Sequence, residues 1–186
     1  MTVNEEKACL PQDMHVFVKE NALDSSMIKL LLNSDVHFKK AEVVVDDKGT
    51  VATSNNRRCR EARLSVDKHL DVFEQVHALF DEANQSFNKE YSRDRTTVSI
   101  MRYTEQDLGH FDWHIDAVNY SSINYVRQLS MSILLDNNYE GGKLCFENRV
   151  FDRPSPGTCI IFPSTYRHKV GVVTRGVRHS LVSWAY

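Results

Sequence analysis

Three His-x-Asp pairs are the residues of this chain best suited to bind a metal ion. They are His69 with Asp71, His110 with Asp112, and His114 with Asp116. Residues two apart on an extended strand point to the same side, so both members of such a pair could reach one ion. With a distant histidine, such a pair gives two imidazoles and one carboxylate, a set that binds Fe(II) and leaves coordination positions open.

The spacing alone does not decide which pair is used. Eight histidines and 25 acidic residues among 186 positions would give such a pair about once by chance. His69 lies at the start of a helical pattern, where residues two apart are about 200° apart around the axis, so this pair is excluded. His110 and Asp112 follow Gly109 in a loop-like stretch and could be solvated, and they stay open beside His114 and Asp116.

The N-terminal third predicts elements of both kinds. Residues 21–33 predict a short helix capped by Asp24 or Ser25, residues 37–46 a strand, residues 46–49 a turn, and residues 55–66 an extended segment. A second helix is expected from Asp67 onwards. Its apolar stripe recurs at helical spacing: Leu70, Phe73, Val76, Phe80, Ala83 and Phe87.

The second half of the chain predicts short strands separated by turn residues. Alternating or apolar runs occupy residues 96–104, 129–135, 143–146, 158–162, 168–173 and 177–184, and Thr174–Gly176 is expected to form a hairpin loop. Many short strands without intervening helices favour an antiparallel sandwich or barrel. The prediction is a mainly β (α+β) protein of one domain, residues 1–186, in which residues 1–95 support a core at 96–186.

Composition narrows the class of protein. Apolar residues make up 41% and charged residues 26%, and the net charge of −2 gives no general attraction to nucleic acid or anionic membrane. No stretch of 18 apolar residues predicts a membrane span, and the first residues lack the apolar segment of a secretory signal. The four cysteines form no Cys-x-x-Cys motif, which favours reduced thiols and a cytoplasmic location.

Three blocks of sequence resemble the prolyl 4-hydroxylase-like oxygenases that depend on Fe(II) and 2-oxoglutarate, closest to the compact bacterial and phage-type members. The first block is Tyr103-Thr-Glu-Gln-Asp-Leu-Gly-His-Phe-Asp-Trp-His-Ile-Asp116, the second runs over residues 127–144, and the third over residues 157–184. Their order and spacing match over residues 96–186. The resemblance implies a double-stranded β-helix, a jelly-roll-like barrel, with N-terminal helices that buttress it.

The resemblance also implies roles for single residues. His114, Asp116 and His168 would ligate Fe(II). Arg178 would pair with the distal carboxylate of 2-oxoglutarate, a bidentate task that suits a planar guanidinium, although collagen-type members have lysine there. Ser180 and Tyr103 would add contacts to the co-substrate.

The implied activity is hydroxylation of an unactivated C–H bond with Fe(II), 2-oxoglutarate and O₂, and ascorbate as the reductant. A prolyl or similar side chain of a peptide, protein or amino acid is the expected substrate; the substrate itself and the oligomeric state are not readable from the sequence. The alternatives are an oxidative nucleobase demethylase and a non-catalytic 2-oxoglutarate- or metal-binding module. Nucleic acid is the less expected partner because basic and aromatic residues do not interleave.

Other conspicuous residues are interpreted without a direct chemical role. Arg175 is expected to face water, His179 to point away from Arg178, and a packing role is expected for Trp113, Trp184, Cys145 and Cys159. The basic run Arg57-Arg58-Cys59-Arg60 with Arg63 is interpreted as a solvated strand edge, with contact to an acidic peptide or nucleic acid left open.

Overall fold

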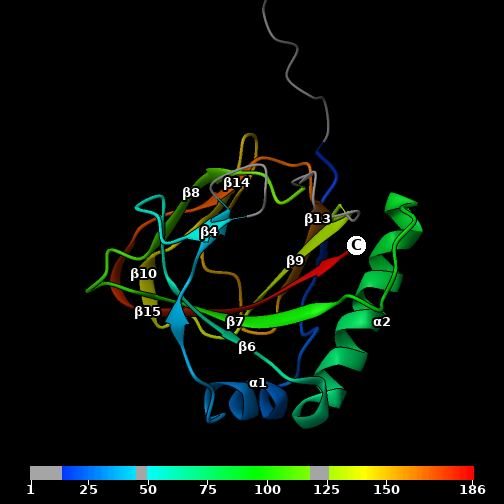
Figure 1. The fold of residues 1–186 in the computed structure, drawn as a ribbon, viewed down its shortest axis with the longest axis horizontal. Helices are drawn as coiled ribbons and strands as arrows, with labels where there is room; N and C mark the ends of the chain where they lie inside the picture. Colours follow the sequence, from blue (N-terminus) through cyan, green and yellow to red (C-terminus); the bar gives the residue numbers. More distant parts are fainter. Residues whose placement is uncertain (1–13, 45–49, 118–125) are drawn as a thin grey trace, which may run out of the picture.

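The computed structural model describes residues 14–44, 50–117 and 126–186, and two antiparallel sheets face each other within them (Figure 1). The larger sheet has the order β1 (Phe17–Lys19), β13 (Cys159–Pro163), β9 (Leu129–Leu134), β15 (Val173–Ala185), β7 (Thr97–Thr104), β6 (Arg60–Arg63) and β2 (Lys39–Lys40), and β10 (Tyr139–Gly141) also pairs with β15. The smaller sheet has the order β12 (Val150–Phe151), β11 (Leu144–Phe146), β14 (His168–Val170), β8 (His110–His114) and β5 (Arg57–Arg58). A separate pair joins β3 (Val43–Val44) to β4 (Val51–Ala52). The expected mainly β, jelly-roll-like architecture is confirmed.

The larger sheet is covered on both faces. Between the two sheets lie residues such as Met101, Tyr103 and Phe162, while the opposite face of the larger sheet packs against the helices through Ile100, Ile133 and others. As a result, all six residues of β9 are buried. Its alternating polar side chains therefore face the interior between the sheets rather than water.

The helical segments of the described residues are α1 (Ser25–Leu32), a short 3-10 helix η1 (Val66–Lys68) and α2 (Leu70–Phe87). Asp24 caps α1 as expected, because its carboxylate accepts the Met27 backbone N–H at 2.8 Å. The stripe of α2 is confirmed at Phe73, Val76, Phe80 and Ala83, which are buried. The prediction is wrong for Leu70, which is the first helical residue and stays 56% exposed.

Two strand predictions differ from the structure. The strand at 37–46 is divided, since β2 joins the larger sheet and β3 pairs with β4; its last two residues and the turn at 46–49 lie outside the described residues. The prediction of a hairpin loop at Thr174–Gly176 is wrong, because these residues lie within strand β15. The chain leaves the smaller sheet after β14 and enters the larger one at Val173, and Gly176, with φ +75°, lies within β15 opposite Tyr139.

Strands from the first 95 residues complete both sheets. β1 pairs with β13 and β6 with β7 in the larger sheet, whereas β5 pairs with β8 in the smaller one. This region therefore contributes strands as well as buttressing helices. None of the described helices combines the length and apolar character needed to span a membrane.

Candidate active site

A β-bulge in β8 determines where His114 points. His168 lies opposite His114, but Val170 lies opposite Phe111, so β8 has one more residue than β14 over this interval. The irregularity places Phe111 and His114 on the same side, with their rings stacked 3.5 Å apart. Without it, alternation would turn His110 and His114 to the same face.

His114, Asp116 and His168 converge on one point. Each offers one ligand atom, and these atoms lie within 4.8 Å of one another. The Nδ1 atoms of the histidines contact backbone carbonyls, Asp112 O at 2.7 Å and Tyr166 O at 3.0 Å. Both Nε2 atoms then remain free to face Asp116, each 3.6 Å from one of its carboxylate oxygens. Two imidazoles and one carboxylate with a shared focus are a donor set that fits divalent iron.

The charge state of the cluster suits a metal ion. Burial and the neighbouring His168 lower the pKa of His114 to about 4, against a smaller opposing effect of Asp116, so its imidazole is neutral near pH 7. Burial by itself would raise the pKa of Asp116, but His168, His114 and Arg127 outweigh it and hold that pKa at about 2. The cluster thus presents a neutral His114 and a carboxylate.

Asp116 is held by side chains from three other segments. Its Oδ2 accepts hydrogen bonds from Ser130 Oγ at 2.7 Å and from Trp184 Nε1 at 3.0 Å. Arg127 lies 3.9 Å from its Oδ1 and places its guanidinium 4.0 Å from the centre of the Trp184 ring system. Trp184 therefore positions a carboxylate, which its interpretation as a packing residue did not foresee.

The other two His-x-Asp pairs are not part of this cluster. His110 contacts Leu108 O through Nδ1, and the Asp112 side chain is 61% exposed. His69 precedes α2 and contacts Ser65 O, so it serves the helix start.

Arg178 is a buried cation on the larger sheet. It is 1% exposed, lies opposite Tyr103, and has its guanidinium 5.3 Å from the centre of that ring. Its Nη1 donates to Ser180 Oγ at 3.0 Å, while its Nε has no partner among the described residues. No described carboxylate pairs with Arg178, so the arrangement fits an anionic ligand. The sequence-predicted trio of Arg178, Ser180 and Tyr103 is thus brought together.

Two residues beside Arg178 were not identified from the sequence. Tyr139 lies next to its guanidinium, and burial raises the pKa of this phenol. Gly142, in the second block of the family resemblance, leaves room for Arg178: a Cβ there would lie 2.8 Å from Arg178 Cδ, and φ is +59°. Gly141 and Gly142 are adjacent in the sequence and form a visible signal, but the contact of Gly142 with Arg178 depends on the fold.

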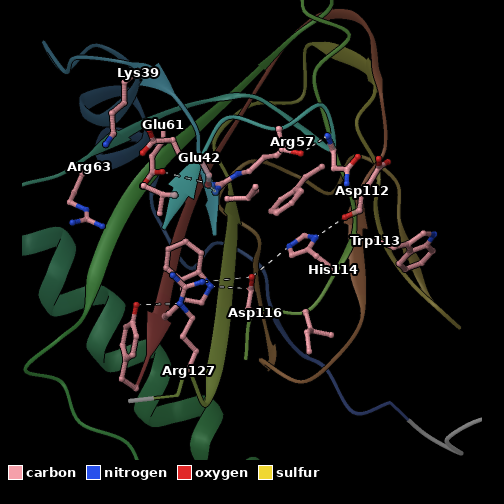
Figure 2. Close-up of a pocket in the computed structure, with 18 residues that line it drawn as sticks. Lys39, Glu42, Arg57, Glu61, Arg63, Asp112, Trp113, His114, Asp116 and Arg127 are labelled. Carbon is pink, nitrogen blue, oxygen red and sulfur yellow. Dashed lines mark hydrogen bonds and ion pairs between the residues drawn. The ribbon is translucent and has the colours of Figure 1, made fainter. Parts of the chain in front are cut away.

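A cavity of about 610 Å³ opens in front of the cluster (Figure 2). His114, Asp116 and Arg127 lie on one part of its wall, and Arg57 and Glu61 on another. Arg57 is not a solvated edge residue: its side chain is 13% exposed and its guanidinium lies 4.8 Å from the centre of the Phe111 ring.

The remaining interpretations have mixed outcomes. Arg175 is exposed beside Glu140, and His179 pairs with Asp136, both as expected. Cys159 is fully buried, as expected, whereas Cys145 is only half-buried. The packing role expected for Trp113 is wrong, since this residue is 36% exposed and lies against the cations Arg167 and Lys169.

Comparison with known proteins agrees with this geometry. Residues 98–186 match the model of the 2OG-Fe(II) oxygenase superfamily. A PKHD-type hydroxylase of Prochlorococcus marinus (strain NATL2A) is 35% identical over 156 residues, which cover 80% of this chain and 70% of that protein. The chain belongs to this superfamily. A second PKHD-type hydroxylase, from Synechococcus sp. (strain CC9311), is 28% identical over 67% of this chain, which spans only 58% of that relative's length.

Two solved structures of prolyl hydroxylases share the fold of this chain. The viral collagen prolyl hydroxylase of Paramecium Bursaria Chlorella virus-1, in its 2OG complex, matches with a TM-score of 0.66 and 17% identity over 91% of this chain and 94% of that chain. A Trichoplax adhaerens prolyl hydroxylase, in complex with a hypoxia inducible factor oxygen degradation domain peptide fragment, matches with a TM-score of 0.67 and 18% identity. The match covers 92% of this chain and 83% of that chain.

Proposed function

We propose that this protein is an Fe(II)- and 2-oxoglutarate-dependent hydroxylase of a prolyl or similar side chain in a peptide, protein or amino acid. The observation that carries the proposal is the convergence of the ligand atoms of His114, Asp116 and His168, two of which line a cavity. The same fold also buries Arg178 without a described carboxylate partner. The family membership and the peptide complex of one structural neighbour support it.

In this proposal His114, Asp116 and His168 hold Fe(II), and Arg178, Ser180 and Tyr103 hold 2-oxoglutarate. When bound, Fe(II) and 2-oxoglutarate would supply the oxidising chemistry: O₂ converts 2-oxoglutarate to succinate and CO₂, and this is coupled to hydroxylation of a C–H bond of the substrate. The chain's own part is positioning. Ser130 and Trp184 fix the Asp116 carboxylate, and the buried guanidinium of Arg178 pairs with a carboxylate while the apolar walls exclude water.

The test is succinate release from 2-oxoglutarate with Fe(II), O₂ and ascorbate, together with the mass gain of one oxygen atom in prolyl peptides. We expect turnover by the wild type and none by His114→Ala. Arg178→Ala should raise the KM for 2-oxoglutarate about 100-fold, since two hydrogen bonds to a charged group are lost. Arg175→Ala is the matched control, because Arg175 is an exposed arginine of the same strand.

Binding of 2-oxoglutarate without succinate from any peptide or amino acid would instead indicate a non-catalytic binding module. Ascorbate dependence is checked by omitting it. The cytoplasmic location and the single-domain organisation remain predictions from the sequence.

A further inference from the structure

A second groove, of about 560 Å³, lies beside the site cavity and carries the basic run that the proposed chemistry does not use. Its lining includes Lys40, Arg58 and Arg60, and Asp107 is the one carboxylate among the described residues that line it. None of these three cations forms an ion pair within the described parts of the chain. Among the described residues, the Arg58 guanidinium donates a hydrogen bond to the neutral Asn55 side chain, at 3.4 Å. The groove is therefore strongly positive on a protein whose net charge is −2.

The strand register adds a row of like charges. Lys40 lies directly opposite Arg60 across β2 and β6, and Arg60 lies directly opposite Arg102 across β6 and β7. Directly opposed residues share one face of a sheet, and like charges there destabilise it. An anion lying over the row would offset the repulsion.

The groove adjoins the site cavity. Ser54 and Arg57 line both hollows, so the two share a wall. Glu61 lines the site cavity, whereas its neighbour Arg60 lies on the other face of β6 and lines the groove. A polypeptide with one side chain in the site cavity would reach the cations by passing over the shared wall formed by Ser54 and Arg57.

We propose that this groove binds an acidic segment of the polypeptide substrate, next to the residue presented to His114, Asp116 and His168. The substrate assignment rests on the function proposed above, whereas binding of the acidic segment does not need turnover. A peptide fits better than nucleic acid, because the described residues that line the groove include no aromatic ring to stack on bases.

The test is fluorescence anisotropy with labelled peptides that carry one proline flanked by aspartates or by asparagines, at low and at high salt. The aspartate peptide should bind about tenfold more tightly, with a gain that salt removes, as expected for a few exposed ion pairs. The variant Lys40→Gln/Arg60→Gln should lose this gain. The matched control is Lys29→Gln/Lys89→Gln, two exposed lysines elsewhere on the chain.

A thermal melt separates binding from a structural role. Relief of the repulsion should leave the Tm of Lys40→Gln/Arg60→Gln unchanged or higher. Equal affinity for both peptides, or a lower Tm with unchanged peptide binding, would overturn the proposal. Tighter binding of a single-stranded oligothymidylate than of the aspartate peptide, lost in the same variant, would overturn the choice of a peptide.

The two proposals can fail separately. Binding of the aspartate peptide that depends on Lys40 and Arg60, without succinate from any substrate, would refute the hydroxylase and keep the groove. Succinate release with no preference for acidic flanks would refute the groove and keep the hydroxylase.

Discussion

Replacing Trp184 with phenylalanine should weaken metal binding without removing any of the three proposed ligands. The indole N–H of Trp184 is one of two hydrogen bonds that Asp116 Oδ2 accepts, the other coming from Ser130. Phenylalanine keeps an aromatic face for the Arg127 guanidinium, which lies 4.0 Å from the indole. The substitution therefore removes chiefly the hydrogen bond.

The size of the effect follows from the charge of the acceptor. A hydrogen bond to a charged group contributes about 1.5–3 kcal/mol. Loss of such support for a metal-bound carboxylate costs roughly 10- to 100-fold in metal affinity. The pKa of Asp116, held at about 2, should also rise, because Trp184 is one of the groups that lower it.

The assay is titration of the metal-free protein with Mn(II), followed by electron paramagnetic resonance of the free ion, which does not depend on turnover. Trp113→Phe is the control, since Trp113 is exposed and lies against Arg167 and Lys169 rather than Asp116. Unchanged Mn(II) affinity in Trp184→Phe would refute the positioning role. An equal loss in both variants would show that the effect is not specific to the Asp116 hydrogen bond.

Three further predictions concern stability and co-substrate binding. The free energy of unfolding of the metal-free protein should fall by up to about 3 kcal/mol as the pH is lowered from 6.5 to 4. Burial lowers the pKa of His114 to about 4, so over this range the unfolded chain binds a proton that the folded chain does not. Urea unfolding should show a flatter pH profile for His114→Gln. Gly142→Ala should lower stability by about 1–3 kcal/mol, because φ is +59° and its Cβ would meet Arg178; Gly171→Ala, with its nearest contact at 3.6 Å, should cost less in the same thermal melts. Ser180→Ala should raise the KM for 2-oxoglutarate about fivefold in the succinate assay, as Arg178 Nη1 loses its 3.0 Å acceptor; an unchanged KM would contradict the role of Ser180.

Local periodicity predicted those parts of the fold that depend on neighbours in sequence. The stripe of α2 and the Asp24 cap follow from spacings of three or four residues, and both are present. The hairpin at Thr174–Gly176 failed for a tertiary reason. A glycine with positive φ commonly marks a turn, but Gly176 lies within a long strand opposite Tyr139, and only the pairing with β10 distinguishes the two cases.

The candidate site also has parts that the sequence predicted and parts that depend on tertiary contacts. The family resemblance grouped His114, Asp116 and His168, which the structure brings together. Spacing alone could not separate His110 from His114, because the bulge that turns them apart depends on the register with β14. The bond between Trp184 and Asp116 spans 68 residues, and no local pattern encodes it.

The position of the site follows from the two faces of the larger sheet. The face against α2 must be apolar, so alternation along β9 and β15 turns Ser130, Arg178 and Ser180 to the other side, between the sheets. Buried polar groups there need partners, and Ser130 and Ser180 have them. Arg178 Nε has none among the described residues. The fold thus buries a charge that an anionic ligand would satisfy, so co-substrate binding and the stability of this sheet should be coupled through the same guanidinium.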